Sequence, residues 1–545
     1  MGQADFDTIV IGGGHNGLVA AITLARAGQK VLVLEAKDRF GGAAITGDLA
    51  DGYRLSRGAH LLHMLPRSLE RKLRLESHGL EFAAQNLKTI ALDLGGNHAV
   101  FAGRSLSGGS AADESHYSVY YEEMQQLAKF FAPLLLARAP RLSRSRAEPH
   151  AVTEGLSDAL SLALTGLRLR LLGKRRMQEM LRIIGMNAYD LAEEHFESSL
   201  VKGAVAFDAV LGTEFGPRTP GTVLSYLYRL SANHAAGNSL TQPKGGMGGV
   251  TQSLVRAAEA AGVVLKLDCP VAKVLTARGG KDAGKGDEFG EDYATGVVTR
   301  SGDEYHARHI LSNVDPKTTV LSLVGPQYFD TDFVRRVHSI RMRGVSGKLH
   351  LALKSRPEFT GLSEAELVNR LIIAPSPEAV ERAVDATKYG EFAAQPVMEI
   401  TVPTLADASL APNGEHLISA VVVGIPPEFK GGWKADSRKA LFKTVMGVLE
   451  SYAPGLGKSV IHSEILTPSD LAAEFALPGG CWHHGSLTFD QFFFMRPTYG
   501  ASQYQTPLSG LYLCSAGNHP GGGVMGMAGL NAARQVLRHP ISKHR

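Results

Sequence analysis

A strand, a glycine-rich turn, a helix and a second strand follow one another within residues 7–42, and this succession constrains the fold most. Thr8–Ile11 is a short β-branched run that leads into the glycines of Gly12–Gly17. Leu18–Arg26 has an apolar helical pattern, and Val31–Leu34 reads as a second buried strand. The order predicts a parallel βαβ unit that binds a dinucleotide.

The glycines have the spacing G-x-G-x-x-G, and each has a separate physical task. Gly12 permits the tight turn, Gly14 lets the backbone approach a pyrophosphate, and Gly17 allows the helix to pack close on the sheet. The helix N-terminus presents unpaired N–H groups and a positive dipole end to the phosphates. Glu35 ends the second strand, where an acidic side chain accepts the ribose hydroxyls of an adenosine.

A second glycine pair, Gly41 and Gly42, follows Glu35 and gives another close approach of the backbone to the same ligand. The form E-x5-G-G-x3-T, which ends at Thr46, resembles the FAD-binding superfamily of amine oxidases and phytoene desaturases. Plain NAD dehydrogenases lack this form, so the resemblance implies FAD rather than NAD.

A second unit of strand, glycines and helix closes the sequence. Leu511–Cys514 reads as a buried strand and Met527–Leu537 as a helix, with Gly517 and the cluster Gly521–Gly526 between them. A helix N-terminus aimed at the pyrimidine end of a flavin would stabilise the negative charge that develops there on reduction.

The bulk properties exclude several classes of protein. A chain of 545 residues is long enough for two or three domains, and a net charge of +4 is too small to indicate a nucleic-acid partner. Cys269, Cys481 and Cys514 are far apart, so neither a disulfide framework nor a zinc site is predicted, and no metal is expected. With no apolar run of membrane-spanning length and no room before the first strand for a signal peptide, the predicted location is the cytoplasm.

The predicted fold class is α/β, with a Rossmann-like FAD-binding domain of the amine oxidase and phytoene desaturase type and a discontinuous α+β substrate domain. The FAD domain is expected in three segments, and the substrate domain in a helical cap and a part with an antiparallel sheet. The predicted FAD segments are 1–67, 240–326 and 501–545, the cap is 68–239, and the sheet part is 327–500.

Two polar segments lie within the predicted domains. The segment 156–184 is a basic helical pattern, which could lie on an anionic membrane surface or be a solvated face whose leucines pack on the core. Gly166 and Gly173 interrupt it and favour the second interpretation. The segment 279–292 is a polar, glycine-rich loop.

Motifs along nearly the whole chain resemble the phytoene desaturase-related flavoproteins, with the desaturase-type β-carotene ketolases as a further group. They include DTIVIGGGHNGLVAA, PKGGMGG, PVAKVL, SLTFDQFFFMRP and YLCSAGNHPGGGVMGMAGLNAA. The resemblance implies that the ADP half of FAD lies at Gly12, Gly14, Gly17, Glu35, Gly41 and Gly42, with Val271 at the adenine. It places Gly517 and Asn518 beside the pyrophosphate and ribitol, and Gly522, Gly523 and Gly526 around the isoalloxazine.

Three residues are candidates for chemistry, and for each a structural hydrogen bond is the alternative. His519 lies in the flavin-side glycine loop, His484 precedes the S-L-x-x-D-Q pattern, and Lys348 lies on a strand where amine oxidases can hold a lysine near flavin N5. Cys481 follows a glycine pair, but its surroundings differ from those of covalently flavinylated enzymes, so noncovalent FAD is expected. Arg57, His60 and His63 could also face a ligand.

The leading functional hypothesis is an FAD-dependent oxidoreductase that oxidises or desaturates an apolar, isoprenoid-like substrate by hydride transfer to flavin N5. The aromatic run Phe492–Phe494 would suit an apolar channel, and oxygen, a quinone or another acceptor would reoxidise the flavin. One alternative is an amine or amino-acid oxidase with Arg57 or Arg496 as the carboxylate anchor. The other is a flavin-binding regulatory protein with little turnover.

Overall fold

The computed structural model of the chain describes residues 5–139, 173–278 and 292–538, together with residues 163, 166–167 and 170–171. The predicted loop at 279–292 lies outside the described residues except for its last residue, and so does much of the predicted basic helix at 156–184. The continuous described helix in that region is α5, Lys174–Gly185.

The predicted N-terminal βαβ unit is confirmed. β1 (Phe6–Ile11) leads through the glycine turn into α1 (His15–Ala25), and β2 (Val31–Leu34) pairs with β1 in parallel. The last four residues of β1 and all four of β2 are buried. This continuous burial is typical of parallel strands that are covered on both faces, and the β-branched sequence suits it.

The sheet around this unit gathers strands from distant parts of the chain. Its parallel part has the order β10, β2, β1, β13, and β19 pairs with β13 as well. β13 is the longest of these strands, and its first residues pair antiparallel with β12, which in turn pairs with β11. The bounds are β10 Val264–Lys266, β11 Val271–Arg278, β12 Asp292–Thr299, β13 Glu304–Ser312 and β19 Leu511–Leu513.

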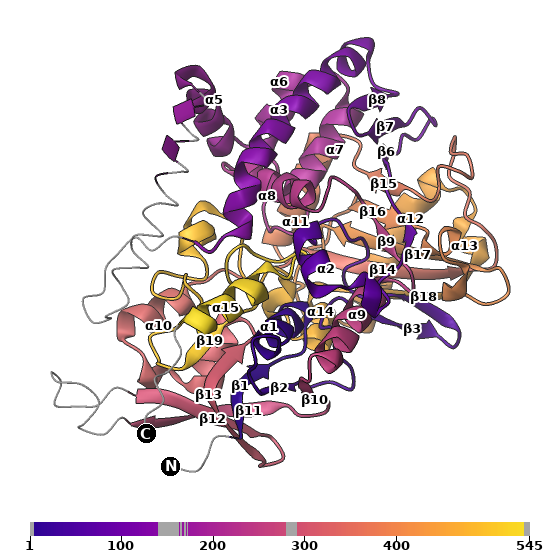
Figure 1. The fold of residues 1–545 in the computed structure, drawn as a ribbon. Coiled ribbons are helices and arrows are strands. Elements are labelled where there is room, and N and C mark those ends of the chain that lie inside the picture. The colour runs from indigo at the N-terminus through magenta and orange to yellow at the C-terminus, as the bar shows by residue number, and fades with distance from the viewer. Residues whose placement is uncertain are drawn as a thin grey trace.

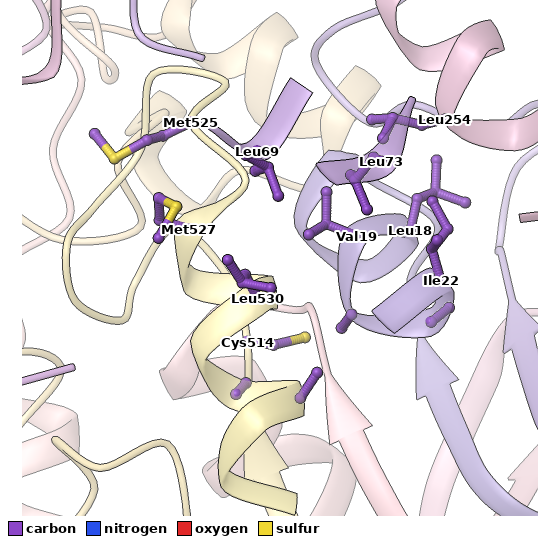
Figure 2. Close-up of a cluster of buried hydrophobic side chains, with 14 of the residues drawn as sticks. Leu18, Val19, Ile22, Leu69, Leu73, Leu254, Cys514, Met525, Met527 and Leu530 are labelled. Carbon is purple, nitrogen blue, oxygen red and sulfur yellow. The ribbon is translucent and has the colours of Figure 1, made fainter. Parts of the chain in front are cut away.

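The C-terminal helix α15 (Met527–Arg538) packs against α1, so the two ends of the described chain meet beside this sheet (Figure 1). The contact is close because Gly529 has no side chain: a Cβ there would lie 2.0 Å from the Asn16 carbonyl oxygen. Figure 2 shows Val19 of α1 and Leu530 of α15 in one cluster of buried apolar side chains. Burial of this cluster holds the two ends together.

A second sheet has eight strands in the order β18, β14, β17, β16, β15, β6, β7, β8. The antiparallel sheet predicted within 327–500 is present, but β6, β7 and β8 come from residues 89–107, and β6 pairs with β15 in parallel. These added strands have three or four residues each, too few to show an alternating pattern in sequence. The bounds are β6 Thr89–Ala91, β7 Ala99–Ala102, β8 Ser105–Ser107, β14 Ser346–Leu353, β15 Arg370–Ile373, β16 Val397–Thr401, β17 His416–Val423 and β18 Val460–Leu466.

Every residue of β14 is buried, and its side chains alternate between two different environments. Leu349, Leu351 and Leu353 pack into the core that α12 (Ala435–Tyr452) covers. Because successive side chains of a strand point to opposite faces, Lys348 and His350 face the other way. On this second face of the sheet, the neighbouring strands β15, β16 and β17 pack against α7 (Ser199–Val210) and α11 (Pro377–Lys388).

Helices form a separate layer over residues 111–235, seen at the top of Figure 1. α3 begins in a capping box, in which Ser110 and Asp113 each bond the other's backbone N–H, and such a box fixes where a helix starts. The core of this layer holds Tyr120, Leu191 and Leu227. Its helices are α3 Ala111–Leu136, α5, α6 Ala188–His195, α7 and α8 Thr222–Ala235.

The remaining elements connect these layers, and in the part of the chain that the structure describes no helix is both long and apolar enough to cross a membrane. The predicted domain boundaries stay a prediction. The connecting helices are α2 Arg67–Leu73, α9 Met247–Ala260, α10 Thr331–His338, α13 Leu456–Ser459 and α14 Pro468–Phe475. Two short hairpins pair β3 Thr46–Ala50 with β4 Tyr53–Ser56, and β5 Phe82–Ala84 with β9 Gln242–Pro243.

The close contact of α15 with α1 predicts that Gly529→Ala destabilises the protein by about 1–3 kcal/mol, the usual cost of forcing a group into a packed core. The matched control is Gly447→Ala in the exposed part of α12, where a Cβ meets nothing within 4 Å. That change removes a helical glycine without a clash and should stabilise by about 0.5–1 kcal/mol. Urea unfolding measures both variants, and equal effects would contradict the proposed role of Gly529.

Candidate active site

A cavity of about 800 Å³ lies where the parallel sheet meets the larger sheet. One end is lined by the N-terminal glycine turn and by Glu35, and the other by Lys348 and Glu399 of the larger sheet. A volume of this size suits an enclosed cofactor together with part of a substrate. Most of the residues predicted from sequence to bind FAD or to do chemistry lie on this one cavity.

The glycine turn has the geometry that its sequence predicts. Gly12 has a φ of +94°, and its N–H donates to the Leu34 carbonyl at 2.8 Å, which joins the turn to β2. A Cβ at Gly17 would lie 2.2 Å from the Gly12 carbonyl oxygen, so α1 can leave the turn closely only with a glycine there. Gly14 and Gly42 line the cavity beside each other, and a Cβ on Gly42 would lie 3.4 Å from the Gly14 Cα.

Glu35 is buried at the end of β2, and its carboxylate is held by the backbone. Oε2 accepts from the Gly13 N–H at 2.7 Å, and Oε1 accepts from the Lys37 N–H at 3.0 Å. Burial raises the pKa of Glu35, while these backbone donors oppose the shift. Each carboxylate oxygen keeps a further lone pair for a hydroxyl group, and Val271 lies on the same cavity.

The C-terminal glycine loop meets the cavity at only part of its length. Gly523 lines the cavity, whereas Gly517, Gly522 and Gly526 are required by close packing. A Cβ at Gly517 would lie 2.5 Å from Pro316, and one at Gly522 would lie 2.8 Å from the His483 ring. The Asn518 amide is fully buried, and neither its nitrogen nor its oxygen has a hydrogen-bond partner among the described residues.

Lys348 points into the cavity from the larger sheet and contacts His60. The distance from Lys348 Nζ to His60 Nδ1 is 2.7 Å, and from His60 Nε2 to Glu399 Oε1 it is 2.8 Å. Lys348 pairs with Val421 of β17, and Val421 pairs with Glu399 of β16, so the lysine and glutamate lie two strands apart, roughly 10 Å. The His60 ring, from the loop after β4, spans this gap.

The Glu399 carboxylate begins a chain of buried charges. Its other oxygen accepts from Arg370 Nε, and the Arg370 guanidinium also donates to Asp208 of α7, with Nη2 at 2.5 Å from Oδ1 and Nη1 at 3.1 Å from Oδ2. Although burial raises the pKa of Glu399, the charge of Arg370 and the hydrogen bond from His60 hold it well below its usual range. The negative charges of Asp208 and Glu399 outweigh the effect of burial and raise the pKa of Arg370. Arg370 and Glu399 therefore both stay ionised.

Several cavity histidines are neutral and keep free ring nitrogens. His484 is predicted from sequence, and the structure adds His15 and His483. His15 Nε2, His483 Nδ1 and His484 Nδ1 have no hydrogen-bond partner among the described residues. Burial lowers the pKa of His15 to about 4 and of His483 to about 3, and it lowers that of His484 too. Neutral imidazoles of this kind can donate to or accept from a bound ligand.

His519 and the run Phe492–Phe494 lie away from the residues that line the cavity. His519 is fully buried, its Nε2 lies 2.9 Å from the Leu134 carbonyl oxygen, and its ring stacks edge-on against Phe493 at 5.1 Å. Phe492 packs against Tyr228. These contacts fasten the C-terminal loop to the helical layer, and a direct catalytic part for His519 stays a prediction.

The two arginines considered as carboxylate anchors are both engaged. Arg57 lines the cavity, but it forms ion pairs with Glu464 and, at 2.9 Å, with Glu474. Arg496 is 1% exposed, and within the described residues its guanidinium donates to five backbone carbonyls. These belong to His483, Gly485, Ser486, Gln491 and Ala516.

The sequence reasoning missed Glu399, Arg370 and Asp208. Each is a charged residue inside an apolar element: VMEIT for β16, RLII for β15 and SLVKGAVAFDAV for α7. A charge in such a position needs a partner, because burial of an isolated ion is costly. That rule could have flagged all three residues, although it does not show which ones pair.

The residues present fit an FAD molecule. The paired glycines leave the backbone open at the cavity wall, Glu35 offers carboxylate lone pairs, and His15 and His484 offer free ring nitrogens. The glycine turn precedes α1, whose N-terminus offers N–H groups to phosphates.

Comparison with known proteins identifies the family. The family model described as flavin containing amine oxidoreductase matches residues 17–537. The chain belongs to this family. It is therefore an FAD-dependent oxidoreductase, which confirms the cofactor and enzyme class predicted from the glycine motifs.

Curated relatives of this flavoenzyme include the rat pyridine nucleotide-disulfide oxidoreductase domain-containing protein 2. It is 31% identical over 557 residues, which cover 98% of this chain and 94% of the rat protein. The zeta-carotene-forming phytoene desaturase of Myxococcus xanthus is 25% identical and covers 95% of this chain and 90% of its own length. These matches confirm the predicted resemblance to phytoene desaturase-related flavoproteins. The motifs quoted from the sequence also predict a resemblance to the type of the rat protein, and its match confirms that prediction.

A solved structure of a putrescine oxidase triple mutant has a TM-score of 0.61 at 16% identity, covering 98% of this chain and 99% of that one. It shows the shared fold. Disulfide exchange, which the rat protein's name mentions, has no support here because the sequence has no C-x-x-C pair and Cys269, Cys481 and Cys514 lie far apart in it. Burial raises the pKa of Cys481 and Cys514, which disfavours the reactive thiolate.

We expect Glu35→Leu to weaken FAD binding by at least about tenfold, since the substitution removes the acceptor for the Gly13 N–H and for a ribose hydroxyl (about 1.4 kcal/mol). Glu81→Leu is the control, because Glu81 is 63% exposed, pairs with Lys244 and is not among the residues that line the cavity. Titration of apoprotein with FAD, followed by flavin fluorescence, gives both dissociation constants. Unchanged affinity in Glu35→Leu would remove Glu35 from the cofactor site.

Arg370→Met should destabilise the protein by about 3–5 kcal/mol, because it leaves the buried Glu399 carboxylate without its partner. Arg335→Met breaks an ion pair with Asp332 in which the arginine side chain is 72% exposed, and it should change stability by about 0.5 kcal/mol at most. Chemical unfolding of the two variants tests the difference. A small loss in Arg370→Met would show that the buried charges are weakly coupled.

Proposed function

We propose that this enzyme oxidises or desaturates a mainly apolar, isoprenoid-like small molecule, and that Lys348 accepts the proton released in the reaction. The observation that carries the proposal is the buried Lys348 amine, which lies on the same cavity as the FAD-binding glycines. Apolar side chains surround that end of the cavity, including Leu61, Leu211 and Val421. The Myxococcus relative, a phytoene desaturase by name, supports a substrate of terpenoid type.

Oxidation of a C–H bond with formation of a double bond removes two electrons and two hydrogens. Bound FAD supplies the hydride acceptor. The second hydrogen leaves as a proton and needs a base on the protein. Oxygen, a quinone or another acceptor takes the electron pair afterwards. The apolar walls around Lys348 hold the substrate and exclude water.

Lys348 suits the part of the base because its proton affinity is adjusted to neutral pH. Burial lowers the pKa of Lys348 to about 7, and the negative charge of Glu399 opposes the shift. Below this value the amine is protonated and has no lone pair to offer. Above it the amine is neutral and can accept a proton, so activity should rise with pH through about 7 and then level off.

An amino-acid substrate fits the cavity less well. Arg57 already pairs with Glu464 and Glu474, and Arg496 donates to backbone carbonyls and is not among the residues that line the cavity. An amine without a carboxylate needs no such anchor, so simple amines are included among the compounds tested for flavin reduction.

Membrane contact and a cytoplasmic location stay predictions. In α5, Met180 and Ile183 are buried, while Arg175 and Arg176 are exposed. α5 thus packs Met180 and Ile183 on the core, whereas its Leu181 is 58% exposed on the same outer side as the charged residues.

The direct test is anaerobic reduction of the purified flavoenzyme, followed as loss of visible flavin absorbance. We expect isoprenoid polyenes to reduce it and Lys348→Met to slow the reduction by about 10²–10⁴-fold, the usual contribution of a positioned base. The rise with pH through about 7 should disappear in this variant. Lys354→Met, at an exposed lysine just after β14, is the matched control and should keep the wild-type rate and pH profile.

Three other results would each overturn the proposal. Full activity in Lys348→Met would remove the lysine from the reaction. Reduction by putrescine or cyclohexylamine but by no isoprenoid would establish the amine oxidase alternative. No reduction by either class would favour a regulatory protein with little turnover.

A further inference from the structure

His60 lies between a base and a carboxylate, and each of its ring nitrogens faces one of them. Nδ1 lies 2.7 Å from Lys348 Nζ, and Nε2 lies 2.8 Å from Glu399 Oε1. Nδ1 is also 3.4 Å from the Ser419 hydroxyl, which can either donate or accept. All three residues that form the line are buried, with His60 8% and Lys348 2% exposed.

The His60 ring is neutral, so it carries one proton on one of two nitrogens. Burial lowers the pKa of His60 to about 4, and the neighbouring Lys348 charge adds to the shift. The Glu399 carboxylate is ionised and can only accept hydrogen bonds. Its partner on the imidazole must therefore be a donor, which puts the His60 proton on Nε2.

We propose that Glu399, acting through the Nε2–H tautomer of His60, keeps the lone pair of the Lys348 amine free for a proton from the substrate. This inference rests on the proposed function of Lys348 as the base. In this arrangement the His60 Nδ1 lone pair accepts one N–H of Lys348. His60 and Glu399 are thus positioning residues for the lysine.

The opposite tautomer would have the opposite effect. An Nδ1–H of His60 would donate to Lys348 Nζ and occupy the lone pair that the reaction needs. The lysine would still be buried and hydrogen-bonded, so stability alone does not distinguish the two arrangements. The position of one proton on His60 therefore decides whether Lys348 is available as a base.

The remaining contacts fix Glu399 in the required orientation. Arg370 donates to Glu399 Oε2, which leaves Oε1 for His60. Asp208 holds Arg370 from the far side, and Arg229 lies 3.4 Å from Asp208. The other charged or titratable groups that act on this line are Arg57, His63 and His350.

Glu399→Gln gives a sharp test because it changes the hydrogen bonding with almost no change in shape. Arg370 offers only donors, so the Gln oxygen must face Arg370 and its NH₂ must face His60. The His60 Nε2 then has to accept, and the ring proton moves to Nδ1. Asp208→Asn is the matched control: it removes a carboxylate from the same chain of charges but leaves the contact of Glu399 with His60 in place.

Two measurements on the purified full-length flavoenzyme read the outcome without turnover. Nitrogen-15 NMR of histidine-labelled protein reports which His60 nitrogen is protonated, with the signal assigned by its loss in His60→Gln. Competitive acetylation followed by peptide mass spectrometry gives the pH midpoint of Lys348. We expect Nε2–H in the wild type and in Asp208→Asn, Nδ1–H in Glu399→Gln, and a Lys348 midpoint lower by about one pH unit in Glu399→Gln.

His60→Gln is a further variant with a defined result. Its amide can donate to Glu399 and accept from Lys348, as the Nε2–H tautomer does, so the Lys348 midpoint should stay near the wild-type value. His60→Leu cannot bridge Glu399 and Lys348, so the pH midpoint of Lys348 should move away from the wild-type value in this variant.

An Nδ1–H signal in the wild type would overturn the inference, and this measurement needs no variant to fold. An unchanged tautomer in Glu399→Gln would overturn it as well. Failure of the proposed function gives a different pattern: Lys348→Met would be fully active while His60 still carried its proton on Nε2. Conversely, an inactive Lys348→Met with an Nδ1–H in the wild type would retain the base and refute its positioning by Glu399.

Discussion

The cost of burying an ion shapes the centre of this enzyme. Arg370 is 2% exposed, and such a burial is tolerated only because carboxylates face it on two sides. One carboxylate belongs to β16 and the other to α7, so the arginine joins the larger sheet to the helical layer. Glu399 in turn contacts His60 of the loop after β4, and His60 contacts Lys348 of β14. The end of the cavity that holds Lys348, which we propose as the substrate end, is therefore held by matched charges rather than by apolar packing alone.

The cofactor end is held differently, by the absence of side chains. Gly17 and Gly529 each bring two pieces of backbone closer than a Cβ would allow, one inside the glycine turn and one between α1 and α15. Such contacts define distances closely because backbone atoms cannot move aside as side chains can. The enzyme thus combines a sterically defined glycine turn at the proposed cofactor site with an electrostatically defined proposed substrate site, and Lys348 faces the cavity between them.

The sequence predicted those parts of the site whose residues lie close together along the chain. Gly12, Gly14, Gly17 and Glu35 lie within one short segment, so their spacing predicted one nucleotide-binding turn. Gly12, Gly14 and Glu35 line the cavity, and Gly17 packs behind its wall. Glu399, Arg370 and Asp208 come from separate elements, and no spacing brings them together before the sheet order is known. The same limit affected β6–β8, which are too short to show a period. It also affected Phe492–Phe494, because apolar side chains suit the observed packing of Phe492 on Tyr228 and of Phe493 on His519 as well as a channel. Lys348 was found by resemblance, but its partner His60 is separated from it by 288 positions.

The parallel sheet takes its first strands from the start of the chain and β19 from near its end. During synthesis the glycine turn therefore leaves the ribosome long before β19 and α15, the elements that complete its sheet and cover α1. The apolar face of α1 that Leu530 and its neighbours bury has no native cover in the meantime. A ribosome that stops before residue 511 releases a chain with an exposed hydrophobic helix and an open flavin site. Completion of the parallel sheet therefore waits for residues that are translated long after the glycine turn.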